Sequence, residues 1–350
     1  MNHLLAVWGA FFLLGASSAT AADRPPANRS FVDLHVDLSY QSRYKGQPFA
    51  EGKGRFPAAS LLAAGVRAVV LPLYIPNDVS PTGPRMQDLD ASYQAIASAL
   101  AATPPYQSPG CALRPGKVTV LLSFEGAAPL AGHPEQVKRW IDRGVRSFGL
   151  VHNQDNALAT SSAGGKRRRS YGLTPAGEEL VAEVFRHGAV VDVSHASDKA
   201  TRDVLELARR DHGVVVATHS NAWRLANHVR NLRDPLLRGI ADTGGVIGVN
   251  FHSRFLTGTA RTASLADVVK HIRYIAELVG VAHVGIGSDY EGGIRPPPEL
   301  RHVRGLPKLR RALRESGFSV REVESIFGQN ALRALCGPPV PSVQARSSAR

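Results

Sequence analysis

The segment Phe31-Val-Asp-Leu-His-Val-Asp37 has the pattern of a buried strand that ends in polar side chains. Its apolar residues alternate with Asp33, His35 and Asp37, so these three side chains are expected on one face of the strand. A carboxylate or an imidazole is costly to bury unless it is paired or coordinated. The segment therefore predicts a strand whose end carries metal-ligating groups.

The same pattern recurs along the chain, where four further apolar runs each end in a residue that can bind a metal. These residues are Glu125, His195, His219 and Asp289, which close the segments 118–125, 189–195, 214–219 and 284–289. Taken singly, each could also be a rim salt bridge, a hydrogen-bonded histidine or a turn residue. Taken together, they predict a metal site at one end of a parallel sheet.

Strand-like runs alternate with amphipathic helical segments, which is typical of βα units and a parallel sheet. The expected strands are residues 31–38, 66–75, 118–127, 145–152, 189–197, 214–220, 244–251 and 281–289. The expected helices are residues 87–102, 134–143, 174–187, 197–210, 234–241, 264–279, 308–315 and 319–335. Eight such units predict an α/β fold closed as a (β/α)8 TIM-type barrel. An open doubly wound sheet is the alternative.

Composition and charge limit the domain organisation and the partners. The chain has 350 residues, of which 43% are hydrophobic and 20% charged, and this suits one large globular domain. We expect this barrel domain to span residues 22–337, followed by a disordered tail at residues 338–350. The formal net charge is +13, but the only tight basic cluster, residues 166–169, has no interleaved aromatics or nucleic-acid motif. We interpret that cluster as a solvated loop and expect no nucleic-acid partner.

The first residues have the pattern of a targeting segment. Residues 4–15 are apolar but too few to span a bilayer comfortably, and Ala19-Thr-Ala21 forms a cleavage signal. These features predict a signal peptide over residues 1–21, export to the periplasm or the exterior, and no stable membrane anchor. An uncleaved anchor is the alternative. Export would permit a disulfide between Cys111 and Cys336, but the sequence does not show whether they lie within reach.

The candidate metal ligands are six carboxylate and imidazole residues: His35, Asp37, Glu125, His195, His219 and Asp289. Six ligands are too many for one tetrahedral catalytic zinc ion that also holds a water. They suit two ions roughly 3.5–4 Å apart that share a carboxylate and a bridging hydroxide. Mixed nitrogen and oxygen ligands favour Zn²⁺, two per chain, with Mn²⁺ or Co²⁺ as substitutes. Such a pair would lower the pKa of a bridging water and polarise a scissile carbonyl. The residues therefore predict a metallohydrolase.

An ordered set of motifs between residues 31 and 335 resembles the membrane dipeptidase (renal dipeptidase) family and its exported bacterial members. The set includes Asp-Leu-His35-Val-Asp37, Phe-Glu125-Gly, Gly-Leu-Val-His152-Asn, Val-Asp-Val-Ser-His195, Thr-His219-Ser-Asn, Val-Arg230-Asn-Leu-Arg-Asp and Gly-Ser-Asp289-Tyr-Glu-Gly. Members of that family are binuclear zinc peptidases with an amidohydrolase-like barrel. The resemblance implies a zinc-dependent dipeptidase that hydrolyses dipeptides with a free carboxylate, and it suggests a homodimer.

The resemblance also implies a role for each site residue. The metal ligands would be His35, Asp37 and Asp289 for one zinc, His195 and His219 for the other, and Glu125 between them. The catalytic set would be Glu125, His152 and Asp289. In that set His152 stabilises the oxyanion, and Asp289 takes a proton from water and returns it to the leaving amine. Arg230 would bind the terminal carboxylate of the substrate, beside His152 and Asp289.

The chain departs from the family pattern at one position, and two rival functions are open to it. The family usually reads Asp-Phe-Asp-Gly where this chain has Asp289-Tyr-Glu291-Gly. We expect the longer Glu291 to alter the local loop and the amino-terminal side of the substrate pocket, more than the metals. The first rival is an amidohydrolase that acts on N-acyl-amino acids or lactams at the same site. The second is a non-catalytic, metal-stabilised binding protein.

Overall fold

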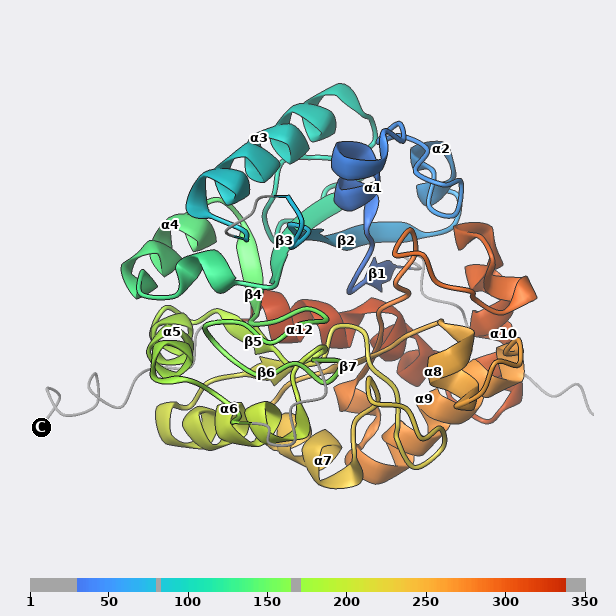
Figure 1. Cartoon of the computed structure of the whole chain (residues 1–350). Coiled ribbons are helices and arrows are strands. Elements are labelled where there is room, and N and C mark those ends of the chain that lie inside the picture. Colours follow the sequence, from blue (N-terminus) through green and yellow to red (C-terminus); the bar gives the residue numbers. More distant parts are fainter. Residues whose placement is uncertain (1–29, 80–82, 165–170, 338–350) are drawn as a thin grey trace, which may run out of the picture.

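The computed structural model describes residues 30–79, 83–164 and 171–337 (Figure 1). The predicted signal peptide at 1–21, the predicted tail at 338–350 and the basic cluster at 166–169 lie outside the described residues.

Eight parallel strands form the centre of the molecule. They are β1 (Phe31–Asp33), β2 (Val66–Leu73), β3 (Thr119–Glu125), β4 (Val145–Gly149), β5 (Val190–Asp192), β6 (Val215–Val216), β7 (Ile247–Val249) and β8 (Val284–Ile286). Strands β1 to β6 pair in sequence order, and β7 pairs with β8. A parallel bridge between Ala217 and Ile247 joins β6 to β7. The Leu34 amide donates to the Ile286 carbonyl at 2.9 Å and so joins β8 to β1. The predicted barrel is therefore confirmed, and the open sheet is wrong.

The strands are shorter than predicted because the chain leaves the ladder soon after each strand passes the barrel core. The strand expected over residues 31–38 ends at Asp33, and Leu38 already belongs to a helix. At the last strand, residues 281–283, which were expected to begin it, form a 3₁₀ turn before β8. After β8, Asp289 and Glu291 adopt left-handed φ angles of 62° and 70°. The turns that follow β1 and β8 leave the polar side chains at the rim, beyond the apolar core.

Helices surround the barrel, as Figure 1 shows. They are α1 (Leu38–Lys45), α2 (Ala58–Leu61), α3 (Met86–Ala102), α4 (Val137–Asp142), α5 (Pro175–Arg186), α6 (Asp198–Asp211), α7 (Asp234–Asp242), α8 (Ser253–Thr257), α9 (Leu265–Val279), α10 (Leu306–Glu315), α11 (Val320–Glu324) and α12 (Asn330–Cys336). The short helices α1, α2 and α8 were not predicted. The helix expected over residues 319–335 is divided by a wider π-helical turn at Ser325–Gln329. The outer core fills the space between sheet and helices; Trp140, for example, packs its ring against Phe124.

Helix α12 closes the amino-terminal end of the barrel. Its residues Ala331, Ala334 and Leu335 belong to the apolar cluster that fills the barrel interior. The Asn330 side chain fixes the helix by donating to two carbonyls of the turn into β8. A disulfide between Cys111 and Cys336 ties the end of this helix to the segment that precedes β3. Because this end is closed, the carboxyl ends of the strands provide the open mouth of the barrel.

Candidate metal and substrate site

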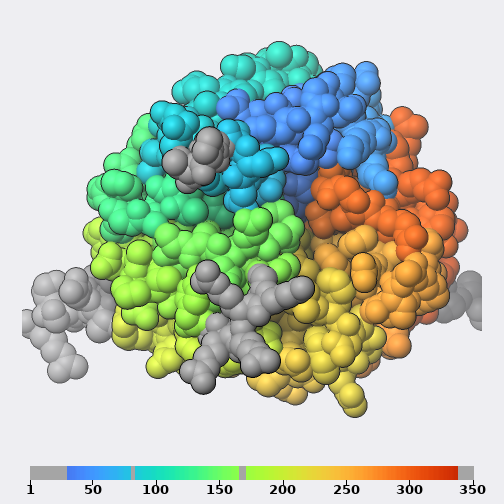
Figure 2. All heavy atoms as spheres, in the orientation of Figure 1, coloured from blue at the N-terminus to red at the C-terminus, as the bar shows by residue number. Residues whose placement is uncertain are grey.

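The predicted site residues meet at the carboxyl ends of the strands. They line a cavity of about 630 Å³ whose walls include Asp37, Glu125, His152, His195, His219, Arg230 and Asp289. His35 lies among them but is only 1% exposed. Figure 2 shows the face on which segments from the blue, green, yellow and orange parts of the chain lie side by side. The structure thus brings together every site residue that the sequence predicted.

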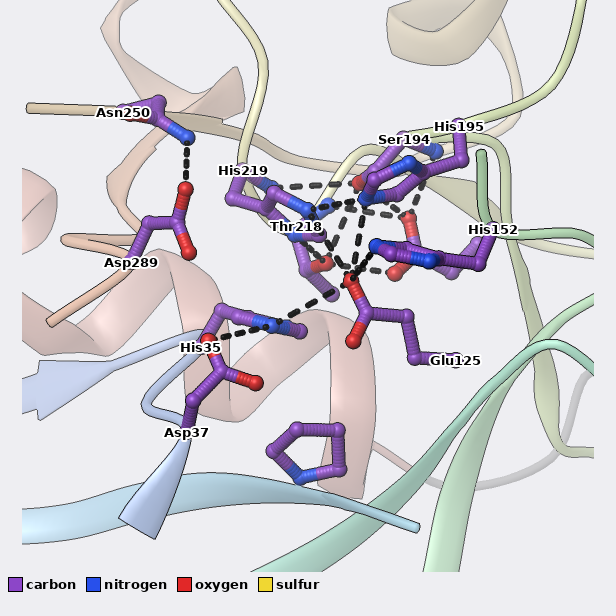
Figure 3. Close-up of polar contacts among 12 residues, drawn as sticks. His35, Asp37, Glu125, His152, Ser194, His195, Thr218, His219, Asn250 and Asp289 are labelled. Carbon is purple, nitrogen blue, oxygen red and sulfur yellow. Dashed lines mark hydrogen bonds and ion pairs between the residues drawn. The ribbon is translucent and has the colours of Figure 1, made fainter. Parts of the chain in front are cut away.

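The carboxylate of Glu125 lies at the centre of the histidine cluster (Figure 3). Its Oε1 atom is 2.9 Å from His195 Nε2, 3.6 Å from His219 Nε2 and 3.6 Å from His35 Nε2. His152 Nε2 is more distant, at 3.9 Å. Since Glu125 is the last residue of the fully buried strand β3, the backbone holds this carboxylate at the axis of the site. A single oxygen therefore faces four imidazoles.

A second cluster adjoins the first through His35. His35 Nε2 is 3.5 Å from Asp37 Oδ2, and ligand atoms of His35, Asp37 and Asp289 lie within 4.8 Å of one another. Asn250 Nδ2 donates to Asp289 Oδ2 at 2.8 Å and so fixes one oxygen of that carboxylate. A Cβ at Gly292 would lie 2.3 Å from Asp289 Oδ1 and 2.5 Å from Asp37 Oδ2. Only glycine therefore leaves room for these two carboxylates.

Hydrogen bonds determine which nitrogen of two histidines carries the proton. His195 Nδ1 is 3.2 Å from Asn153 Oδ1, a carbonyl oxygen that can only accept. His219 Nδ1 is 2.9 Å from Thr218 Oγ1. The Thr218 hydroxyl itself donates to the buried carboxylate of Asp192, so it must accept from His219. Both rings therefore carry their hydrogen on Nδ1 and present a lone pair on Nε2.

The lone pairs converge. His195 Nε2 and His219 Nε2 are 2.9 Å apart, and both face Glu125. Burial lowers the pKa of both histidines well below the usual value, so neither gains a second proton at neutral pH. Both ring nitrogens of buried His35 lack a hydrogen-bond partner within the described chain. Converging acceptors repel one another unless a cation lies between them, and this nitrogen and oxygen set is one that Zn²⁺ accepts.

Burial and neighbouring charges raise the pKa values of two carboxylates and one histidine in the site. Burial, reinforced by the charges of Asp37 and Asp289, raises the pKa of Glu125 to about 8. Burial and the charge of Asp37 raise the pKa of Asp289 to about 7. For His35, burial opposes protonation, but the charges of Glu125 and Asp37 outweigh it and raise the pKa to about 10. Divalent cations would stabilise the ionised carboxylates against both their burial and their mutual repulsion.

Arg230 provides a cation among the residues that line the cavity. Its side chain is 5% exposed, and neither terminal guanidinium nitrogen has a hydrogen-bond partner among the described residues. Burial lowers its pKa to about 10 despite the charges of Asp289 and Glu125, so it remains protonated at neutral pH. A buried, unpaired guanidinium next to a cavity is costly, and an incoming carboxylate would pair with both nitrogens.

His152 lies beside the candidate metal ligands, with its ring 4.5 Å from that of His195. Burial and the Arg230 charge lower its pKa to about 4, so the ring is neutral. The side-chain nitrogen of Asn153 lies 3.2 Å from His152 Nε2, which places the ring hydrogen on Nδ1 in this orientation. Asn153 therefore contacts both His152 and His195 and sets the proton position of each.

Sequence reasoning missed four residues that orient these groups: Asn153, Asp192, Thr218 and Asn250. Each lies close to a predicted residue in the chain or in space, and Asn153 and Thr218 directly neighbour His152 and His219. A polar residue beside a predicted ligand was the available signal. The contact between Asp192 and Thr218 joins adjacent strands, so the sequence alone could not reveal it.

Glu291 shapes a loop and does not line the cavity. Its buried carboxylate accepts hydrogen bonds from the amides of Lys53, Arg55 and Phe56 at 2.6, 2.9 and 2.9 Å. The expected effect on loop shape agrees with these contacts. The expected effect on the substrate pocket is not seen, since Glu291 is absent from the cavity walls.

Comparison with known proteins establishes the family. The sequence profile of the membrane dipeptidase family, peptidase family M19, matches residues 26–339. The chain belongs to this family. Dipeptidase aclJ of Aspergillus oryzae is 36% identical over 222 residues, which cover 63% of this chain and 52% of the relative. An uncharacterized dipeptidase of Schizosaccharomyces pombe is 35% identical over 217 residues, 62% of this chain and 52% of the relative. The chain thus spans about half the length of these two relatives.

Solved structures show the same fold. Dipeptidase AC, a metallopeptidase of family M19, superposes with a TM-score of 0.75 at 25% identity and covers 89% of this chain and 100% of its own. The probable dipeptidase PvdM of Pseudomonas aeruginosa superposes with a TM-score of 0.76 at 22% identity, covering 91% and 96%. Within the described ranges, this chain has no helix with the length and apolar character needed to span a membrane.

Proposed function

We propose that this family member is a zinc-dependent dipeptidase that hydrolyses dipeptides with a free carboxyl terminus. One observation carries the proposal. The acceptor atoms of His195, His219 and Glu125 converge in the cavity, and the guanidinium of Arg230, whose terminal nitrogens have no hydrogen-bond partner among the described residues, lines the same cavity. A dipeptide presents a carbonyl and a carboxylate at a fixed short separation, which suits a cavity that holds both kinds of group.

The residues fit two divalent cations. His35, Asp37 and Asp289 would hold one ion and His195 and His219 the other, with Glu125 between them. When bound, two Zn²⁺ ions would lower the pKa of a water so that it supplies a hydroxide nucleophile near neutral pH, and they would polarise the scissile carbonyl. The mutual repulsion among the buried carboxylates supports this assignment, because the cations would offset it.

The remaining steps belong to side chains of this chain. Arg230 binds the substrate carboxylate through its two free nitrogens, which fixes the peptide bond relative to the metal cluster. Asp289 accepts the proton of the attacking water and returns it to the leaving amine; Asn250 holds its other oxygen in place. His152 Nε2 faces Glu125 at 3.9 Å, and its role is to donate an N–H to the carbonyl oxygen as negative charge develops there; this requires the ring hydrogen to move to Nε2 and the contact with Asn153 to break when substrate binds.

Two linked measurements test the proposal. Removing metal with a chelator should abolish hydrolysis of dipeptides, and Zn²⁺ should restore it. The same preparation is then assayed on N-acetyl-amino acids and on lactams. Preferential turnover of those amides would replace the dipeptidase by the amidohydrolase alternative. Full metal loading without turnover of any of these substrates would favour the binding-protein alternative.

We also propose that the protein is exported. The disulfide between Cys111 and Cys336 supports this location, because such bonds persist in oxidising compartments. Protease accessibility of the native protein in intact cells, compared with lysed cells, tests the location. The barrel bounds of 22–337, the signal peptide and the homodimer stay predictions.

A further inference from the structure

One wall of the cavity is built around the ring of Phe255 and carries only basic groups. The Arg230 guanidinium lies 5.7 Å from the centre of this ring, and the rings of His228 and His252 lie 4.6 and 4.7 Å from it. Arg254, which neighbours Phe255 on α8, lines the same cavity. Three basic side chains therefore lie around one aromatic ring, and a fourth, Arg254, lines the same cavity; the proposed function uses only Arg230.

Both histidines of this wall act as donors. His228 Nδ1 accepts from the amide of Arg230 at 3.2 Å, and His252 Nδ1 accepts from the amide of Arg295 at 3.1 Å. A neutral imidazole that accepts at Nδ1 carries its hydrogen on Nε2. No hydrogen bond links either Nε2–H to another described residue. Burial lowers the pKa of His228 to about 4 and lowers that of His252 as well, so both stay neutral donors near pH 7.

The wall has no acidic partner. Arg254 is exposed and forms no ion pair with any described residue. Among the described residues, the carboxylates that line the cavity are Asp37, Glu125 and Asp289, and all three belong to the groups that could hold a metal. The wall therefore offers donors and positive charge without an acceptor to balance them.

We propose that this wall binds an acidic side chain on the carboxy-terminal residue of the substrate, so that the preferred dipeptides end in aspartate or glutamate. The inference rests on the proposed function, which places the terminal carboxylate of the substrate on Arg230. The side chain of that same residue then lies beside Phe255, within reach of Arg254 and the Nε2–H groups of His228 and His252.

Chemistry distinguishes an acidic side chain from the alternatives. A lysine or arginine side chain would meet Arg254 and Arg230 without a counter-charge. An asparagine or glutamine side chain would satisfy one donor but would leave the Arg254 charge unpaired. A carboxylate can accept from an arginine and from both histidines at once, since its two oxygens offer about four acceptor sites.

Steady-state kinetics with isosteric pairs test the preference. The substrates are Ala-Glu against Ala-Gln and Ala-Asp against Ala-Asn, each with the carboxy-terminal residue in both configurations. We expect kcat/KM to be about tenfold higher for the acid of at least one pair, the size of one charge-assisted hydrogen bond. The advantage should shrink at high salt, because Arg254 is exposed.

A charge-matched pair of variants assigns the effect to this wall. In R254Q the ratio of kcat/KM for acid over amide should fall toward one. In R209Q, which removes the same charge from an exposed position on α6 outside the cavity walls, the ratio should stay at the wild-type value. Equal kcat/KM for acid and amide in the wild type, with both hydrolysed, would overturn the acidic preference alone. Failure to hydrolyse any dipeptide would overturn it together with the proposed function.

Discussion

Asp192 should control zinc affinity although it lies behind the metal ligands. Its carboxylate accepts from the amides of Ser194 and Thr218 at 3.0 Å each and from both hydroxyls. The Thr218 hydroxyl is thereby directed away from His219, which must keep its hydrogen on Nδ1. In D192N, the new amide would donate to Thr218 Oγ1. That hydroxyl would then donate to His219 Nδ1, and the histidine proton would move to Nε2, the nitrogen that faces the site.

The expected loss follows from this change of tautomer. A ligating imidazole with its hydrogen on the wrong nitrogen must shift that proton before it can bind metal. Replacing such outer hydrogen-bond partners typically lowers metal affinity about 10–100-fold, which is about 1.4–2.7 kcal/mol. Overall stability should change less, because asparagine fills the same volume and keeps the acceptor for the two backbone amides.

The assay is competition for zinc against a chromophoric chelator at pH 7.5, with thermal unfolding of each variant as the check on folding. T218V removes the hydroxyl and should also weaken binding, whereas T218S keeps it and should bind as the wild type does. D142N, an exposed carboxylate on α4, is the control for the charge change alone. A folded D192N protein with wild-type zinc affinity would refute the tautomer argument.

Three further predictions concern the substrate cation, the loop and protonation of the site. R230M should lower kcat/KM for free dipeptides about 10–100-fold, because two charge-assisted hydrogen bonds to the substrate carboxylate are lost. It should not lower kcat/KM for dipeptide amides, and an equal loss for both substrates would contradict carboxylate binding by Arg230. E291Q should lower the free energy of unfolding in urea by about 1–3 kcal/mol, because the three amides of the adjoining loop lose a charged acceptor; an unchanged midpoint would argue against this. Zinc affinity should fall between pH 8 and pH 6, because burial raises the pKa of Glu125 to about 8 and of Asp289 to about 7, so protons compete with the metal below those values. Calorimetric titrations at both pH values measure this, and affinity independent of pH would contradict it.

Local patterns were sufficient to predict the barrel and the convergence of the candidate metal ligands at its mouth. An apolar run that ends in a polar residue predicts a buried strand and also the position where the chain leaves the core, as at Glu125 and His195. The ends of parallel strands share one edge, so these residues had to meet. The exact strand ends were not predictable, because the position where backbone pairing stops depends on the neighbouring strand. Leu38 illustrates this: its apolar side chain suits a strand, yet it begins α1.

Contacts between distant segments determine the rest of the site. Asp192 acquires its role only because β5 and β6 bring it next to Thr218. Glu291 reaches a loop more than two hundred residues away in sequence. The basic wall around Phe255 combines the connections after β6 and β7. A motif predicted Arg230, but no motif indicated His228, His252 or Arg254. Cys111 and Cys336, separated by 225 positions, pair because α12 returns to the barrel end beside the segment before β3.

Titration of metal-free protein with Zn²⁺, followed at each step by the rate of dipeptide hydrolysis, tests the central claim most directly. The converging ligands predict two zinc ions bound per chain and activity that appears as these sites fill. Binding of no zinc by the folded wild-type chain, or full dipeptidase activity before any metal is added, would contradict it.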